Sequence, residues 1–319
     1  MESKRREFLK NSSLITTALL FNQQLKALTG ASGQSSVKNF LHSIPVFHTN
    51  DLRGIIDPGT NKKFSGLGGL SNIEGLVKAQ GSSPVLVDAG DFLNENHSFE
   101  QHKSMIHLMN RIGYHAATFG DRELSLGQDR LANLVPLMNF KLVNCNYEFS
   151  NEILRKNVLQ YYILKYGRFR VGITGVGIRP TKIHGSENIT WHHPYEKANQ
   201  VATYLKRDQK CDLVICLSHI GFKLRDEVID NHKFALDSEN IDIIISGHDD
   251  QVINTLAVLK NKTRDEVFVS NAGWGGLTMG ELRFSYDMLG ERNEFAFKQY
   301  IPGLPFNSSK KEIYRELIA

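Results

Sequence analysis

The chain has 319 residues, of which 41% are hydrophobic and 23% are charged. This composition supplies enough apolar material for a core and excludes disorder as the main state. Three cysteines are too few for a disulfide-dense scaffold, and no stretch reaches the roughly 20 apolar residues of a membrane-spanning helix. The formal net charge of +4 includes +3 from residues 1–31, so the remaining +1 gives no electrostatic case for a nucleic-acid partner.

The first 31 residues have the order of an export signal. The basic doublet Arg5-Arg6 precedes a short apolar run, Leu14 to Phe21, and small residues follow around Ala31. The doublet with Phe8-Leu9-Lys10 resembles a twin-arginine signal. We expect residues 1–31 to be a twin-arginine-type signal peptide that directs the chain to the periplasm or cell envelope, with membrane attachment only if this signal stays uncut. The alternative is an amphipathic first helix of the domain.

From about residue 43, apolar β-branched runs alternate with helical patterns. Short continuous apolar runs are typical of strands that are buried on both faces of a sheet. Strands are predicted at 44–48, 84–88, 116–119, 141–144, 170–174, 212–217, 241–246 and 267–270. Helices are predicted at 69–80, 99–112, 128–137, 195–209 and 224–232. This alternation indicates an α/β layered fold.

Other patterns complete the organisation of the chain. The runs 161–166 and 168–176, separated by Gly167, predict a hairpin. Beyond residue 265 only strands are predicted, at 266–271, 280–287 and 294–301. We expect one domain over 43–302, followed by a tail, 303–319, with a short helix at 310–318.

Asp or His residues follow five of the predicted strands, and ligands of α/β folds bind beyond the carboxyl ends of strands. The five segments are Thr49-Asn50-Asp51-Leu52-Arg53-Gly54, Ala89-Gly90-Asp91, Gly120-Asp121-Arg122-Glu123, Ser218-His219-Ile220-Gly221 and Gly247-His248-Asp249-Asp250. Carboxylate and imidazole ligands that converge in this way suit a divalent metal of the Mn, Fe or Zn kind. Any one of these residues taken alone is more often a turn former or a helix cap.

The series resembles the metallophosphoesterase superfamily, and specifically its periplasmic 5'-nucleotidase/UDP-sugar hydrolase branch. The resemblance covers about residues 43–300. The motifs that carry it are His48-Thr49-Asn50-Asp51, Asp88-Ala89-Gly90-Asp91, Gly120-Asp121-Arg122-Glu123, Leu217-Ser218-His219, Ser246-Gly247-His248, Asn271-Ala272-Gly273-Trp274-Gly275-Gly276 and Gly280-Glu281-Leu282. It implies a calcineurin-like four-layer α/β/β/α sandwich of two mixed sheets, with two metal ions at its centre.

The resemblance also implies which positions would bind the two ions. The first ion would be held by Asp51, the position of Arg53, Asp91 and the position of Asp250. The second ion would be held by Asp91 as a bridge, Asp121, His219 and His248. The family carries at position 122 a His that protonates or stabilises the leaving oxygen, so Arg122 and Asp121 stand at the catalytic positions of this chain.

Departures from the family pattern change the expected metal content. Arg53 and Arg122 replace two expected His residues, Asp250 replaces a third, and Asp121 replaces an Asn. Arginine cannot be deprotonated in a protein and so cannot ligate a metal. Its guanidinium would repel a nearby divalent ion by several kcal/mol at an effective dielectric near 20. We therefore expect one divalent ion (Mn, Zn or Fe) rather than two, with Arg53 in the first site and paired to Asp51 and Asp250.

The sequence allows two roles for each of two side chains, Arg122 and Trp274. Arg122 would either clamp a phosphate bidentately or form an ion pair with Asp121 or Glu123. Trp274, between glycines, would either line the cleft or be a core aromatic, and the core is the commoner place for such a residue.

The expected function is that of a 5'-nucleotidase-like metallophosphatase that hydrolyses a phosphate ester of the nucleotide type, weakened by the loss of one metal site. The alternative is a non-catalytic relative, a pseudoenzyme, that binds a phosphorylated ligand or a partner subunit in the cell envelope. In two-domain relatives a C-terminal domain stacks the nucleobase. We expect a phosphorylated small molecule as ligand. Nucleotide specificity would come either from a separate chain that carries such a domain or not at all.

Overall fold

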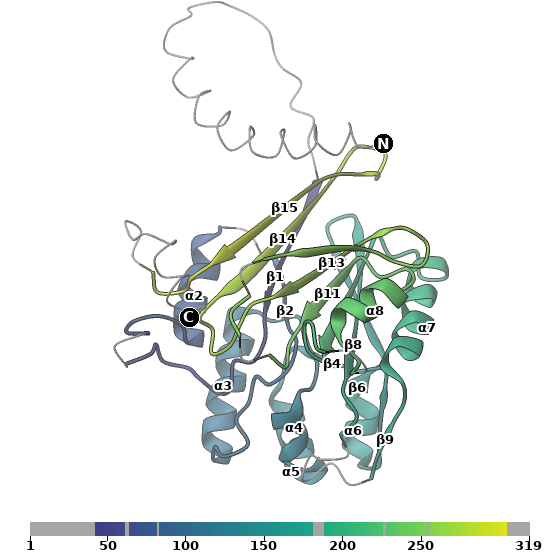
Figure 1. Ribbon diagram of the computed structural model, residues 1–319. Helices are drawn as coiled ribbons and strands as arrows, with labels where there is room; N and C mark the ends of the chain where they lie inside the picture. Colours follow the sequence, from purple (N-terminus) through teal and green to yellow (C-terminus); the bar gives the residue numbers. More distant parts are fainter. Residues whose placement is uncertain are drawn as a thin grey trace, which may run out of the picture. The chain divides into compact units, whose positions relative to one another are not determined.

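Two mixed β-sheets pack face to face at the centre of the protein (Figure 1). The computed structural model describes residues 42–60, 64–81, 83–180, 188–225, 228–249, 251–253 and 255–304. The predicted signal peptide at 1–31 and the predicted helix at 310–318 lie outside these residues. Within them, no helix is both long enough and apolar enough to cross a membrane.

The first sheet has seven strands in the order β15-β14-β1-β2-β3-β4-β6. They are β1 (His42–Thr49), β2 (Val85–Asp88), β3 (Ala116–Ala117), β4 (Lys141–Val143), β6 (Val158–Leu159), β14 (Met279–Tyr286) and β15 (Arg292–Tyr300). The five adjacent strands β1, β2, β3, β4 and β6 run parallel to one another. Strand β14 runs antiparallel to both β1 and β15. The parallel part of this sheet therefore points its carboxyl ends toward one edge.

The second sheet has six strands in the order β12-β13-β11-β10-β8-β7. They are β7 (Tyr161–Tyr166), β8 (Phe169–Gly177), β10 (Leu213–His219), β11 (Ile243–Ser246), β12 (Ala257–Lys260) and β13 (Glu266–Asn271). The four central strands are parallel, and the two edge strands, β12 and β7, are antiparallel to their neighbours. A small third sheet pairs β5 (Tyr147–Phe149) with β9 (Ile189–Trp191).

Helices cover the outer face of each large sheet, which completes four layers (Figure 1). On the first sheet lie α2 (Leu70–Ala79), α3 (Phe99–Ile112), α4 (Asp121–Ser125), α5 (Gln128–Leu134), the 3₁₀ turn η1 (Val135–Leu137) and α6 (Glu152–Asn157). On the second sheet lie α7 (Pro194–Arg207) and α8 (Asn231–Asp237). The four-layer α/β/β/α sandwich predicted from the sequence is confirmed.

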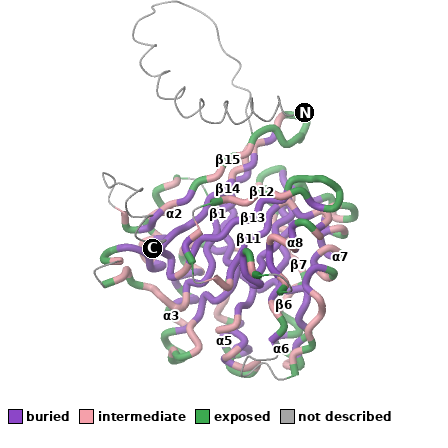
Figure 2. Tube along the Cα trace, viewed as in Figure 1, coloured by how far each residue is buried: buried purple, intermediate pink, exposed green. Residues whose placement is uncertain are grey.

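Alternating side chains place the apolar cores between these layers. Along β10, Ile215 and Leu217 face the other sheet, whereas Val214 and Cys216 face the helices. This period of two is the strand repeat, and apolar residues on both faces explain why the sequence shows continuous apolar runs. Figure 2 shows the buried residues concentrated along the two sheets and the exposed ones on the outer helices and loops.

Local signals explain the bounds of the best-predicted helix, α3. Ser98 caps its first turn, and Gln101 reaches back to the Ser98 backbone in a reciprocal capping box. Gly113 ends the helix in the left-handed conformation, with φ of 94°. The predicted bounds of 99–112 are therefore confirmed to the residue.

The helix predicted at 224–232 is wrong. The structure has irregular backbone at 224–225 and 228–230, and α8 begins only at Asn231. Asp230 is the reason, because its side chain accepts the Lys233 backbone N–H at 2.8 Å and so starts the helix there. The spacing of Leu224, Val228 and His232 imitates a helical face by coincidence. The sequence interpretation also missed β12.

Candidate metal centre

Loops at the carboxyl ends of the strands bring the predicted site residues together. Asp51 and Asp91 follow the neighbouring parallel strands β1 and β2, and Asp121 opens α4 beyond β3. His219 ends β10, and His248 lies just beyond the adjacent strand β11. The two sheets therefore each contribute part of one centre.

Five of the six predicted metal ligands converge in two overlapping groups. Ligand atoms of Asp51, Asp91 and His219 lie within 4.8 Å of one another, and so do those of Asp121, His219 and His248. We call Asp51 with Arg53 the guanidinium half, and Asp121, His219 and His248 the imidazole half. Asp91 lies between the two halves. The sixth predicted ligand, Asp250, lies outside the described residues, so its pairing with Arg53 stays a prediction.

Backbone strain is concentrated in these loops. Among the described residues, eight non-glycine residues have positive φ, and four of them belong to the centre: Asp51, Arg53, Asp91 and His248. Left-handed backbone is unfavourable for residues with a side chain and persists only where surrounding contacts enforce it. Here Asp51 donates its backbone N–H to the Gly90 carbonyl at 2.9 Å, and Arg53 donates to the Asp91 carbonyl at 2.8 Å. The loops are thus locked against each other.

A glycine permits the closest approach in the centre. A Cβ atom on Gly120 would overlap the carboxylate of Asp91. Any larger residue at position 120 would therefore displace Asp91.

His219 points into the centre one ring nitrogen that has no hydrogen-bond partner in the part of the chain that the structure describes. Its Nδ1 lies 2.8 Å from the Ala89 carbonyl oxygen, and because a carbonyl only accepts, Nδ1 must carry the proton. Its Nε2 then faces the Asp91 carboxylate at 3.6 Å and is buried with no hydrogen-bond partner among the described residues. A backbone carbonyl that fixes the ring in this way is the usual support of a metal-binding histidine.

The buried carboxylates of the centre carry more negative charge than the neighbouring cations balance. Burial alone would lower the pKa of His219, but the carboxylates of Asp91, Asp51 and Asp121 raise it well above the usual 6.5. Burial also raises the pKa of Asp51 to about 7. Clustered carboxylates therefore draw a proton onto His219, at the nitrogen that faces Asp91. A divalent cation would meet the same demand with more charge.

Glu123 holds the loop of Asp91 in place, a role that the sequence interpretation missed. This buried side chain accepts backbone N–H groups from Asp91 at 2.9 Å, Leu93 at 2.7 Å and Gly120 at 2.8 Å. Burial raises its pKa to about 8, and the charge of Asp91 adds to the shift. The signal was present, because Glu123 is the third helical residue after Gly120, where a glutamate reaches back to the start of a helix.

Asn50 orients Asp51 in a similar way. Its amide group donates to the Asp51 carboxylate at 2.8 Å, and its carbonyl oxygen accepts the Ala272 backbone N–H at 2.7 Å. The Gly275 backbone N–H donates to the Asp51 carbonyl at 2.7 Å. The glycine-rich loop around Trp274 is therefore fastened to the loop of Asp51.

Arg53 lies beside Asp51 as predicted. Its guanidinium is 3.9 Å from the Asp51 carboxylate and stacks over the Trp274 ring at 5.5 Å from the centroid. Trp274 is only partly buried and contacts Phe64 edge to face at 5.6 Å. Trp274 thus joins a small apolar cluster and also borders the centre, so both interpretations of this residue hold in part.

Arg122 has different partners from those expected. Its guanidinium pairs with Glu95 at 2.6 Å and lies 3.5 Å from the Asp91 carboxylate. The expected partners were Asp121 and Glu123, but Glu123 points its carboxylate at backbone N–H groups instead. Glu95 lies in the irregular loop after Asp91, where sequence periodicity carries no information on side-chain direction.

The residues present fit a divalent cation. The imidazole half with Asp91 offers carboxylate oxygens and a buried, correctly oriented imidazole, which suit Mn, Fe or Zn. The guanidinium half offers Asp51 but also a permanent positive charge 3.9 Å from its carboxylate.

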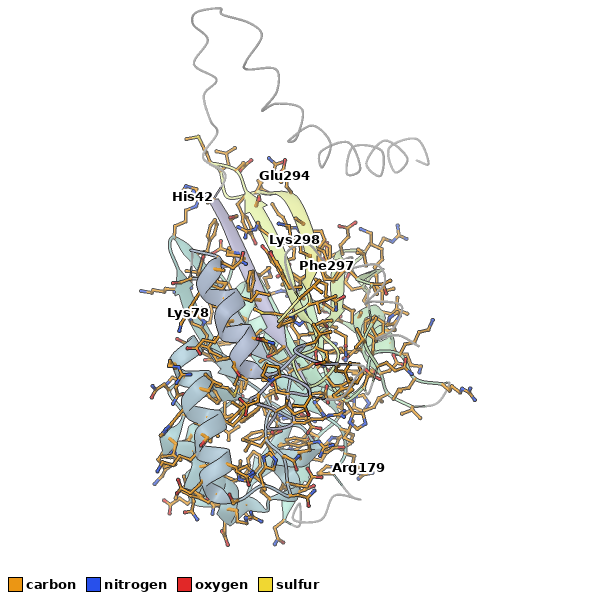
Figure 3. All side chains as sticks on the ribbon, turned by 90° about the vertical axis from the view of Figure 1, so that its left-hand side faces the viewer. His42, Lys78, Arg179, Glu294, Phe297 and Lys298 are labelled. Atoms are coloured by element: carbon orange, nitrogen blue, oxygen red, sulfur yellow. The ribbon has the colours of Figure 1, made fainter. Side chains whose placement is uncertain are left out.

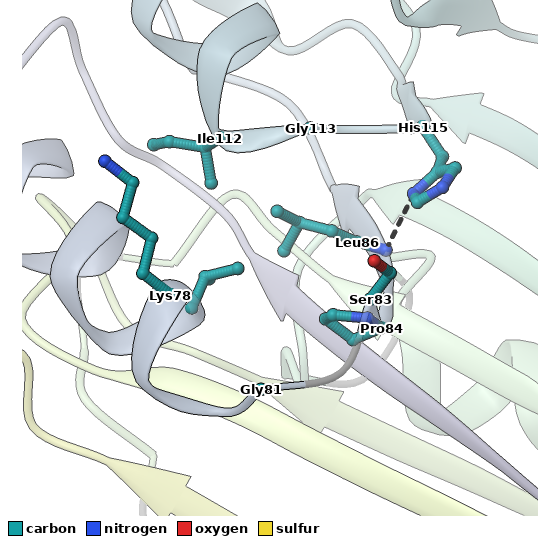
Figure 4. Close-up of a pocket in the computed structure, with 9 residues that line it drawn as sticks. Lys78, Gly81, Ser83, Pro84, Leu86, Ile112, Gly113 and His115 are labelled. Atoms are coloured by element: carbon teal, nitrogen blue, oxygen red, sulfur yellow. Dashed lines mark hydrogen bonds between the residues drawn. The ribbon is translucent and has the colours of Figure 1, made fainter.

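A separate cavity of about 430 Å³ lies away from the centre (Figure 4). It is lined at the amino end of β2 and near the ends of α2 and α3, whereas the centre lies beyond the carboxyl ends of the strands. Its one imidazole, His115, already accepts the Leu86 backbone N–H at 3.2 Å. Nothing in its lining indicates chemistry.

Known proteins share parts of this sequence, although no family model matches the chain. The trifunctional nucleotide phosphoesterase protein YfkN of Bacillus subtilis is 22% identical over 289 residues, covering 79% of this chain and 19% of YfkN. A 5'-nucleotidase of Vibrio cholerae is 23% identical over 258 residues, covering 75% of this chain and 46% of that protein. The chain therefore spans less than half the length of these relatives.

Solved structures share the fold. The crystal structure of a 5'-nucleotidase precursor from Thermus thermophilus matches with a TM-score of 0.73 at 23% identity, covering 86% of this chain and 58% of that one. The calcineurin-like phosphoesterase YfkN matches with a TM-score of 0.66 at 18% identity, covering 86% and 96%. The four-layer architecture described above is thus the one found in these two proteins.

Proposed function

From the premise that the homologues of this chain are 5'-nucleotidases and calcineurin-like phosphoesterases, as its motifs predicted, we propose that it is a metal-dependent phosphoesterase with one divalent ion. Its substrate is a phosphate ester of the nucleotide type. The observation that carries this proposal is the convergence of two ligand groups, Asp121 with His248 and Asp51 with Asp91, on His219, whose buried Nε2 has no hydrogen-bond partner among the described residues.

The chain's own residues divide the work between them. Asp91, Asp121, His219 and His248 hold the ion, with the Ala89 carbonyl fixing the His219 ring. A divalent ion bound there acts as a Lewis acid that offsets charge on the phosphoryl oxygens. Glu123 keeps Asp91 in place through its backbone N–H. These hydrogen bonds position the His219 ring and the Asp91 loop before an ion binds.

Two guanidinium groups flank the ion in this proposal. Arg53 replaces the first ion of the family with a fixed positive charge beside Asp51. Arg122 stands where the family has its acid, and a guanidinium cannot give up a proton to a leaving group. Turnover is therefore expected to be far slower than with two ions and an imidazole acid, although Arg122 can still bind a phosphoryl oxygen.

One observation favours the alternative, a non-catalytic relative that binds a phosphorylated ligand or a partner subunit. Arg122 is held by Glu95 at 2.6 Å, so this cation is committed to a carboxylate beside the centre. A group held in this way suits ligand binding through exchange of its ion pair better than proton transfer.

Export belongs to the same proposal, whereas nucleobase recognition does not. The Thermus relative is named a precursor, which supports an exported chain in the cell envelope, and the Arg5-Arg6 doublet supports the twin-arginine route. Much of each relative extends beyond the matched region, so nucleobase recognition by this chain is left out of the proposal.

Metal content and hydrolysis, measured on the same preparation, test the proposal. We expect about one ion per chain by elemental analysis, and slow, Mn²⁺-dependent hydrolysis of AMP or an aryl phosphate. Two bound ions would contradict the single-ion proposal. No ion, or one ion without any turnover, would favour the non-catalytic alternative.

A further inference from the structure

A β-hairpin ends in two large apolar side chains that face solvent. Met288 and Leu289, in the turn between β14 and β15, are 76% and 89% exposed. The other exposed large hydrophobic side chains of the described residues are exposed by 54% or less. This turn, residues 287–291, is called the tip below. Two such side chains at a single turn are costly in water unless something covers them.

The backbone of the tip is satisfied within the protein. Asp287 accepts the backbone N–H groups of Leu289 and Glu291 on its carboxylate, both at 2.9 Å. The backbone N–H of Gly290 donates to the Asp287 carbonyl at 3.2 Å, and that of Asp287 donates to the Glu291 carbonyl at 3.0 Å. The tip therefore exposes apolar side chains while few of its backbone polar groups depend on water.

A second hairpin supports the tip. Arg168, beside the turn between β7 and β8, donates to the carbonyls of Asp287 at 2.6 Å and Met288 at 3.3 Å. Its guanidinium also lies over the Phe169 ring at 5.0 Å from the centroid. Carbonyls that would otherwise need water are thus bound by a cation that can remain at a polar boundary.

The tip lies at the end of the molecule where the N-terminal segment enters the fold. Tyr286, next to the tip, pairs with His42, the first described residue. In Figure 3, His42 and Glu294 lie near one end of the molecule, and Arg179, just beyond the carboxyl end of β8, lies toward the other. The candidate metal centre is at the carboxyl end, so a surface that contacts the tip leaves the centre open.

We propose that the tip enters the apolar interface of a lipid bilayer. A protruding apolar turn with most of its backbone N–H groups bound within the protein fits a deformable apolar medium, whereas a protein partner would need a matching pocket. The chain that precedes His42 carries the apolar run Leu14 to Phe21 behind a basic segment. The 20 residues between Phe21 and His42 reach at most roughly 65 Å, enough for this run and the tip to meet one bilayer.

Positive and negative charges near the tip are equal in number, so charge does not drive its contact with the bilayer. In or beside the turns of the two hairpins, the cations Lys165, Arg168 and Arg292 are equal in number to the anions Asp287, Glu291 and Glu294. Electrostatic attraction to anionic lipid is therefore weak, and the contact is apolar. Two side chains alone bind a bilayer weakly, so the tip acts once the chain is held near the surface.

Site-specific fluorescence on the full chain tests this proposal. Leu289→Cys and the control Ile153→Cys each receive an environment-sensitive thiol dye, because the three native cysteines are buried. Ile153 is also exposed, and it lies in the first turn of α6 at the opposite end of the molecule (Figure 1). With phosphatidylcholine vesicles we expect a blue shift at position 289 that brominated acyl chains quench. We expect the same shift at high salt and no shift at position 153.

Vesicle co-sedimentation gives an independent readout. Met288→Ser with Leu289→Ser should lower retention by about five-fold, and Ile153→Ser should not. Unchanged emission at position 289, equal shifts at both positions, or unchanged retention would overturn the proposal. A shift that depends on protein concentration without vesicles would assign the tip to a second copy of the chain instead.

Discussion

The guanidinium half and the imidazole half of the candidate centre share one loop architecture but carry different side chains. In both, a strand ends, the backbone turns through a left-handed residue, and a carboxylate or imidazole faces the middle. The imidazole half offers neutral or anionic ligand atoms to a cation. The guanidinium half already has a positive charge, that of Arg53, beside its carboxylate. The backbone thus determines where groups meet, and the side chains determine whether an ion or an arginine neutralises them.

His219→Ala should have the largest effect, because His219 takes part in both groups of candidate ligands. We expect the affinity for Mn²⁺ to fall by more than about 100-fold. Removing a residue that only supports a metal ligand usually lowers affinity by roughly 10- to 100-fold, and removing the ligand itself should lower it further. Isothermal titration with Mn²⁺ measures this change. His192→Ala removes an imidazole that pairs with Glu148 away from the strand ends, and it should leave the affinity unchanged. Similar losses in both variants would break the comparison.

Glu123→Ala tests the hydrogen bonds that hold the Asp91 loop, which lies between the two halves. It leaves three backbone N–H groups without their acceptor, including that of Asp91. We expect a loss of about 2–3 kcal/mol in the free energy of unfolding, measured by urea denaturation. Glu123→Gln keeps an acceptor oxygen and should lose clearly less. Equal losses in the two variants would mean that volume, not hydrogen bonding, explains the role of Glu123.

Arg53→His, combined with Asp250→His, should turn the guanidinium half into an ion site. The double variant removes the fixed charge and supplies the two imidazoles that the family pattern has at these positions. We expect the metal content to rise by about one ion per chain, because an imidazole ligates where a guanidinium cannot. Arg53→Lys keeps the positive charge and should keep the original content. An unchanged content in the double variant would show that Arg53 is not what limits binding.

Asp230→Asn should have the smallest effect, because Asp230 caps α8 and is not one of the candidate ligands. Burial opposes the charge of Asp230, but Lys233 outweighs burial and lowers the pKa of Asp230 below the usual 3.8. A lowered folded-state pKa stabilises the fold above the unfolded-state value, and the contribution is lost as the pH falls through the folded-state value. We expect Asp230→Asn to cost about 1 kcal/mol at neutral pH and nothing at strongly acidic pH.

Urea titrations of wild type and Asp230→Asn across the acid range measure this dependence. Asparagine can still accept the Lys233 backbone N–H but has no second oxygen for the Leu224 N–H. The variant therefore loses this acceptor together with the charge, and the pH dependence of the cost identifies the part due to charge. Asp237→Asn, at the exposed end of the same helix, should change stability by no more than a few tenths of a kcal/mol. A cost for Asp230→Asn that does not change with pH would contradict the electrostatic explanation.

The sequence predicted most of the layered fold and the convergence of Asp51, Asp91, Asp121, His219 and His248. Each of these residues follows a strand whose apolar run is visible in a short window, and parallel strands bring their carboxyl ends to one edge. The helix at 224–232 failed because a helical spacing of apolar residues is only a local pattern. The side chain of Asp230, which accepts the Leu224 N–H at 3.0 Å and caps α8, overrides it.

The sequence by itself determined the order of strands and helices, the residue types at the strand ends and the departures that introduce Arg53 and Arg122. Only the tertiary structure decided that Glu95 pairs with Arg122, that Glu123 supports Asp91, and that Arg168 supports the tip. The physical reason is the range of the interactions. Strand and helix signals lie within a few neighbouring residues, whereas these contacts join separate segments whose distance is fixed only when the sheets pack.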